Sequence, residues 1–184
     1  RGLGDVYKRQ GKTVFGPGAD GAQLEGSKAW MKDLLVEANV PTAKHGTFTN
    51  QDEAISFLSK MPLPYVIKTD GLAAGKGVLV TESLEQAKNA IKNYLSGNAF
   101  GAAGETIVIE EGLTGNEISI LAICDGAKAV PLSPAQDYKR LLDDDNGPNT
   151  GGMGAYSPIP SVSEEFVKRI MDEAVHPTLQ ALIK

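Results

Sequence analysis

The stretch from residue 66 to residue 80 has the residue types and spacing of a loop that binds phosphate. Lys68 lies in a β-branched run, and Lys76 lies in the small-residue loop that follows it. Glycine lets a backbone turn sharply and approach a ligand closely, and small side chains leave the N–H groups open to anionic oxygens. The glycines of this loop are Gly71, Gly75 and Gly77.

The β-branched runs on both sides of the loop predict two strands joined as a hairpin. A Walker A loop requires Ser or Thr after its lysine and then a helix, whereas Gly77 and a strand follow Lys76. A dinucleotide-binding turn is also excluded, because the glycines lead into the strand residues 78–80. On the loop alone, a plain glycine hairpin with surface lysines remains an open alternative.

Two further features have the chemistry of a nucleotide site. Lys28 follows Ser27, the predicted N-cap of a helix, and a helix N-terminus with a lysine suits a phosphate. Residues 110–117 connect two predicted strands, so backbone groups there could bind an adenine edge, with a carboxylate beyond for ribose hydroxyls. Taken singly, the first could be a solvated lysine and the second an acidic turn.

Caps, periodicity and turn residues predict an α+β fold of helices packed on mostly antiparallel strands. Helices are expected at 27–39, 50–61, 83–95 and from Ser163 onward. Strands are expected at 13–15, 66–69, 78–80, 106–111, 116–124 and 127–132, the last two joined at Asp125-Gly126. Residues 133–160 are polar and rich in glycine, and we expect them to form a long loop of the kind that is usually functional or disordered.

The composition of the chain is that of a soluble globular protein. It has 184 residues, 41% hydrophobic and 22% charged, and a net charge of -5, which implies no general affinity for nucleic acid. A single cysteine, Cys124, excludes an internal disulfide, and no apolar run is long enough to span a membrane. We therefore expect a cytoplasmic protein. His45 and His176 have no evident acid–base partner and are interpreted as structural.

Taken in chain order, a lysine at a helix start, a strand lysine with a glycine hairpin, and E-x-x-L-x-G-x-E resemble the nucleotide site of ATP-grasp enzymes. Longer blocks resemble the phosphoribosylamine–glycine ligase family, also called glycinamide ribonucleotide synthetase, of purine biosynthesis. The blocks are GP (16–17), QLEGSK (23–28), DGLAAGKG (70–77), GNAFG (97–101), QDYKR (136–140) and GPNTGGMGAYSP (147–158).

The resemblance implies a partial ATP-grasp fold and an ATP-dependent carbon–nitrogen ligase. In such a ligase, glycine takes the γ-phosphoryl group of ATP, and the amine of 5-phosphoribosylamine attacks the glycyl phosphate to give glycinamide ribonucleotide, ADP and phosphate.

Residues 1–10 are interpreted as a non-native scar. The expected units are 11–44, a linker and first helix; 45–112, a small lobe with the phosphate lid; and 113–184, the start of a larger lobe.

The resemblance also assigns roles by position, with Lys28, Lys68 and Arg140 as catalytic residues. The residues implied for ATP are Lys28, Lys68, Gly71, Gly75, Lys76, Gly77, Glu110, Glu111, Leu113 and Glu117. The residues implied for the other substrates are Asp137, Lys139, Arg140, Asn149, Thr150, Gly151, Gly152, Met153 and Gly154.

The chain departs from the family pattern at both ends. Family members begin with a further α/β domain and continue into a segment of the type E-F-N-x-R-F-G-D-P-E, whose Glu and Asn are the expected ligands of Mg²⁺ or Mn²⁺. We therefore expect an internal fragment that lacks its metal ligands and other parts of its parent, and that has no ligase turnover alone. Two alternatives remain: another ATP-grasp carboxylate–amine ligase, and an inactive nucleotide-binding fragment.

Overall fold

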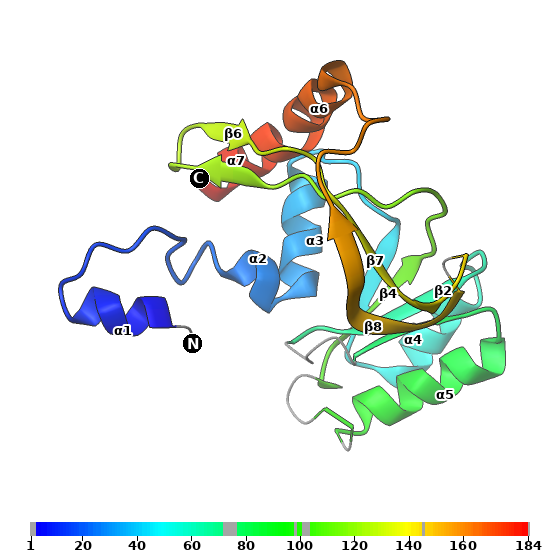
Figure 1. The fold of residues 1–184 in the computed structure, drawn as a ribbon. Helices are drawn as coiled ribbons and strands as arrows, with labels where there is room; N and C mark the ends of the chain where they lie inside the picture. Colours follow the sequence, from blue (N-terminus) through cyan, green and yellow to red (C-terminus); the bar gives the residue numbers. More distant parts are fainter. Residues whose placement is uncertain (1–2, 72–76, 98, 101–103, 145, 184) are drawn as a thin grey trace.

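The computed structural model describes residues 3–71, 77–97, 99–100, 104–144 and 146–183 (Figure 1). The first segment holds two short helices, α1 (Leu3–Arg9) and α2 (Gln23–Gly26), with the coil between them extending away from the rest of the chain. The strand expected at 13–15 is wrong: these residues form no strand, and the Phe15 side chain is exposed. A stretch of three residues without a partner strand cannot form a ladder.

A four-stranded antiparallel sheet organises the next part of the chain, in the order β1-β4-β2-β3. Its strands are β1 (His45–Phe48), β2 (Tyr65–Thr69), β3 (Val78–Thr81) and β4 (Ile107–Glu111). The predicted hairpin is confirmed, because β2 pairs with β3 from Tyr65↔Thr81 to Lys68↔Val78. Alternation along β2 points Ile67 and Thr69 to one face of the sheet and Lys68 to the other.

Three helices begin where the sequence predicts them, each with a polar side chain at its N-terminus. Ser27, Asn50 and Ser83 accept hydrogen bonds from backbone N–H groups of the first turn, as N-caps do. The helices are α3 (Lys28–Glu37), α4 (Gln51–Leu58) and α5 (Leu84–Leu95).

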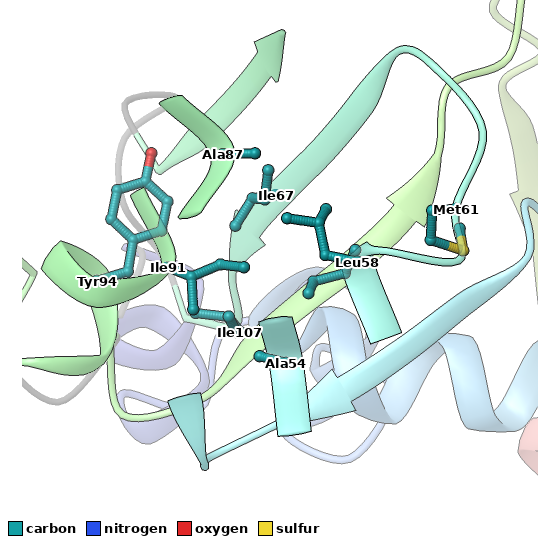
Figure 2. Close-up of a cluster of buried hydrophobic side chains, with 9 residues drawn as sticks. Ala54, Leu58, Met61, Ile67, Ala87, Ile91, Tyr94 and Ile107 are labelled. Atoms are coloured by element: carbon teal, nitrogen blue, oxygen red, sulfur yellow. The ribbon is translucent and has the colours of Figure 1, made fainter. Parts of the chain in front are cut away.

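The hydrophobic core lies where α4 and α5 pack on one face of the sheet (Figure 2). Leu58 from α4, Ile91 from α5, and Ile67 and Ile107 from the sheet are fully buried there. Tyr94 closes one side of this core, where burial raises the pKa of its hydroxyl and its ring meets Phe100 edge to face. The opposite face of the sheet, which carries Lys68, is thereby left for other contacts.

The second half of the chain forms two hairpins and a broken helix. A short hairpin, β5 (Ala122–Cys124) and β6 (Ala129–Pro131), turns at the predicted Asp125-Gly126. The loop expected at 133–160 is wrong, because β7 (Gln136–Leu142) pairs with β8 (Asn146–Tyr156). The Tyr138 and Tyr156 rings stack at 6.2 Å across this hairpin. Glycine-rich β8 has weak strand propensity, so only its pairing with β7 makes it a strand.

The final helix begins after Ser163, as predicted, but it has three parts. These are α6 (Glu164–Ile170), a π-helical turn (Met171–Val175) and α7 (His176–Ile183). The His176 N–H bonds to the Met171 carbonyl, five residues back, just before Pro177. Proline lacks an N–H and crowds the preceding turn, so the wider turn accommodates it. Over the described residues, no helix has the length and apolar character needed to cross a membrane.

Candidate functional site

The end of β2 is joined to the start of α3 through Asp70. Its Oδ1 atom accepts a hydrogen bond of 2.7 Å from the Ala29 N–H, and the Ser27 hydroxyl donates to the same carboxylate at 3.1 Å. A carboxylate at a helix N-terminus is favoured by the helix dipole. Asp70 therefore occupies the N-terminus of α3, where the sequence analysis placed a phosphate.

Lys28 lies beside this junction and points to the first residues of the glycine loop. Its Nζ atom donates to the carbonyl oxygens of Asp70 at 3.3 Å and Gly71 at 3.1 Å. A phosphate at this place could thus bind to the Lys28 side chain, rather than to the backbone N–H groups of the helix.

Lys68 lies on the sheet face opposite the core and pairs with Glu110 of the neighbouring strand. The register sets Lys68 opposite Val108 and Val66 opposite Glu110, so the two charged residues are diagonal neighbours. Lys68 Nζ lies 2.9 Å from Glu110 Oε2. The structure therefore brings together two residues that the sequence analysis assigned to ATP.

The glycine loop begins and ends at this place. The Thr69 N–H donates to the Gly77 carbonyl at 2.8 Å, which closes the base of the hairpin. Gly71 and Gly77 therefore lie next to Lys28 and Lys68. Gly75 and Lys76 lie outside the described residues.

The hinge after β4 is held tightly against two neighbouring segments. The Glu111 N–H donates to the Lys44 carbonyl at 2.9 Å, and the Glu111 carboxylate accepts from the Lys44 N–H at 2.8 Å. A Cβ atom on Gly112 would lie only 2.4 Å from Pro64 Cγ, so this position requires glycine. Leu113 follows and is largely exposed. The hinge is thus fixed, with Leu113 open to a ligand.

Two valines that the sequence analysis did not assign to the site lie on the same face of the sheet as Lys68. Val78 and Val80 pair with Lys68 and Val66 and so share their side of the sheet, and both are exposed. Exposed apolar side chains beside charged groups suit the flat face of a base. Alternation along β3 is the sequence signal that could have identified them.

Glu117, expected at the ribose, pairs with Lys139, a residue expected at the other substrates, which also lies near Asp137. Lys139 Nζ lies 2.6 Å from Glu117 Oε1 and 3.5 Å from Asp137 Oδ2. The hydrogen bond that Lys139 donates to Glu117 raises the pKa of Lys139, which stays protonated at neutral pH. The structure therefore links Glu117, the carboxylate expected at the ribose, to the β7–β8 hairpin.

That hairpin carries every residue assigned to the other substrates. The Thr150 hydroxyl donates to the Lys139 carbonyl at 2.9 Å, and Arg140 Nη1 donates to the Gly147 carbonyl at 3.5 Å. Arg140 pairs with Asn149 in the ladder. The remaining residues lie along β8: Gly151, Gly152, Met153 and Gly154.

No three His, Cys, Asp or Glu side chains in the described parts of the chain come together in a way that could hold a metal ion.

The sequence analysis missed Lys32, which is the buried residue of α3. Its Nζ atom lies 3.3 Å from Glu110 Oε2 and donates to the Thr42 hydroxyl at 2.8 Å. Lys32 follows Lys28 by four residues, so both lie on one face of the helix. That spacing was the available signal, but a lysine is rarely buried unless it is paired.

Comparisons with known proteins agree with this arrangement. The family model for the phosphoribosylglycinamide synthetase ATP-grasp (A) domain matches residues 26–184. Phosphoribosylamine–glycine ligase of Pseudomonas aeruginosa is 48% identical over 181 residues, which are 98% of this chain and 42% of that protein. The ligase of Escherichia coli O6:H1 is 49% identical over 182 residues, again 42% of its length. The chain thus spans less than half of these relatives.

Solved structures show the same fold. The crystal structure of phosphoribosylamine–glycine ligase from Thermotoga maritima matches with a TM-score of 0.84 and 38% identity, over 91% of this chain and 42% of that one. D-alanyl-alanine synthetase A from Vibrio cholerae matches with a TM-score of 0.73 at 14% identity, over 97% of this chain and 55% of that one, which is a likeness of fold alone. The α+β fold is confirmed as an ATP-grasp fold, and the chain belongs to the phosphoribosylglycinamide synthetase family.

Proposed function

We propose that this chain carries the ATP site of a phosphoribosylamine–glycine ligase. The observation that supports this most strongly is that Lys28 contacts the start of the glycine loop at Gly71, while Lys68, on the strand that leads into this loop, pairs with Glu110 on the strand that leads into the hinge. Cations placed where phosphoryl charge develops are the main contribution of a protein to phosphoryl transfer. We therefore assign the phosphates of ATP to Lys28 and Lys68, with Arg140 as a further catalytic residue.

The rest of the nucleotide lies along β3 and the hinge in this proposal. The adenine edge meets backbone groups of Glu111 and Leu113 beside Glu110, and its face packs on Val78 and Val80. Glu117 accepts hydrogen bonds from the ribose hydroxyls. Gly71, Gly75, Lys76 and Gly77 belong to the loop over the phosphates.

The proposed reaction has two steps. A carboxylate oxygen of glycine attacks the γ-phosphorus of ATP, so ADP leaves and glycyl phosphate forms. The amine of 5-phosphoribosylamine then attacks the acyl carbon, loses a proton and expels phosphate, which gives glycinamide ribonucleotide. We assign these substrates to the β7–β8 hairpin, at Asp137, Lys139 and residues 149–154, in a cytoplasmic enzyme that uses Mg²⁺ or Mn²⁺.

Turnover tests this function. The longest reading frame that contains this sequence is purified and given ATP, Mg²⁺, glycine and 5-phosphoribosylamine. We expect glycinamide ribonucleotide and ADP in equal amounts. ADP formation that depends on another amino acid and not on glycine would favour a different ATP-grasp ligase.

The ribose assignment predicts the effect of Glu117→Gln in the same enzyme. The substitution keeps the shape of the side chain and removes its charge, so the KM for ATP should rise roughly three- to tenfold, a modest effect because Glu117 is exposed to water. The KM for glycine should not change. Glu165→Gln, at an exposed glutamate of α6, is the matched control. A rise in the KM for glycine alone would instead assign Glu117 to that substrate.

A further inference from the structure

A buried ionic cluster lies beneath the proposed phosphate site. Glu110 Oε2 is 2.9 Å from Lys68 Nζ and 3.3 Å from Lys32 Nζ. The side chains of Lys32 and Glu110 are each 6% exposed, whereas that of Lys68 is 27% exposed. One carboxylate thus faces two cations, and the cluster has a net positive charge.

The two lysines differ in what they can reach. Lys32 is held by the Thr42 hydroxyl at 2.8 Å and is almost closed off from solvent. Lys68 is partly exposed next to the glycine loop and has Glu110 as its ionic partner. Only Lys68 is therefore placed to turn toward a phosphate.

A buried carboxylate that loses its counter-ion is strongly destabilising. If Lys68 alone balanced Glu110, transfer of Lys68 to a phosphate would leave that charge buried and unpaired. Since Lys32 shares Oε2, Glu110 keeps a cation when Lys68 leaves. We propose that Lys32 is a positioning residue of the nucleotide site, which retains Glu110 so that Lys68 can exchange the carboxylate for a phosphate of ATP.

The other oxygen of the same carboxylate supports this proposal. Glu110 Oε1 is buried and has no hydrogen-bond partner among the described residues. Buried acceptors in folded proteins are normally paired, so an orphaned oxygen calls for a donor that the protein does not supply. A donor from the bound nucleotide could reach it once Lys68 has moved, while Lys32 holds Oε2. The inference rests on the proposed ATP site and adds a residue that does not touch the ligand.

The first test is Lys32→Met, with ATP and adenosine as separate probes in calorimetric titrations of the protein. We expect ATP affinity to fall by about tenfold or more, because Lys68 must then stay with Glu110. Adenosine affinity should change by less than about twofold, since adenosine has no phosphate. Lys92→Met, on the exposed side of α5, is the control and should bind both probes normally.

Unchanged ATP affinity in Lys32→Met would overturn the role of Lys32, and so would an equal loss for both probes, which indicates a merely structural role. If the unmodified protein does not bind ATP, the proposed function itself fails. Equal ATP affinity of the unmodified protein and of Lys32→Met would contradict only the role of Lys32.

A second comparison works even if Lys32→Met does not fold. In Glu110→Gln there is no buried charge to retain, so adding Lys32→Met should change ATP affinity by less than about twofold. The double variant also avoids an unpaired carboxylate. A further loss of about tenfold in the double variant would show that Lys32 acts on ATP independently of Glu110, and would overturn the proposal.

Discussion

Lys68→Met should weaken ATP binding roughly ten- to hundredfold, because a charge-assisted contact to phosphate is worth about 1.5–3 kcal/mol. The methionine keeps most of the side-chain volume, and Glu110 retains Lys32 as its partner. The fold should therefore be preserved while the phosphate contact is lost. Calorimetric titration with ATP measures the effect.

The control for Lys68→Met is again Lys92→Met. This substitution removes an exposed lysine of α5, a helix that packs on the other face of the sheet from Lys68. Thermal unfolding of both variants without nucleotide shows whether the fold is intact. Wild-type ATP affinity in a well-folded Lys68→Met protein would contradict the phosphate assignment.

Leu58→Ala should lower the free energy of unfolding by about 2–5 kcal/mol, since it leaves a cavity in a tightly packed core. Leu58 is fully buried between α4 and the sheet, among Ile67, Ile91 and Ile107 (Figure 2). Denaturant unfolding followed by circular dichroism measures the loss.

The matched control for the core is Leu141→Ala, at a half-exposed leucine of β7. A surface truncation of this kind is expected to change the free energy of unfolding by less than about 0.5 kcal/mol. Equal losses at the two positions would contradict the location of the core between α4, α5 and the sheet.

Local signals predicted much of the fold. Ser27, Asn50 and Ser83 are helix N-caps, and the β2–β3 hairpin follows directly from β-branched runs on both sides of glycine. Helix caps and hairpins between consecutive strands depend on residues that are close in the chain, so their information lies within a short stretch of sequence. The same holds for the turn at Asp125-Gly126.

Features that depend on distant partners were not predicted. The β7–β8 hairpin has too many glycines to be recognised from strand propensity, and its stability comes from cross-strand contacts such as the Tyr138–Tyr156 stack. Asp70 lies more than forty residues from the helix that it caps. Neither pairing has a signal in the local sequence.

The candidate site shows the same division. Lys28 and Lys68 were found from their neighbours in the sequence, and the structure places Lys28 against the start of the glycine loop and Lys68 on the strand that leads into it. Lys32 was missed, because its partner Glu110 lies on a strand far along the chain. The division into units at 11–44, 45–112 and 113–184, and the interpretation of residues 1–10, stay predictions.

The central claim is that Lys28 and Lys68 bind the phosphates of ATP, and a crystal structure with a non-hydrolysable ATP analogue tests it most directly. We predict phosphate oxygens within hydrogen-bond distance of both Nζ atoms, with Lys68 turned away from Glu110 and the Lys32–Glu110 ion pair intact. A nucleotide bound elsewhere, with Lys28 still on the Asp70 and Gly71 carbonyls and Lys68 still on Glu110, would contradict the account.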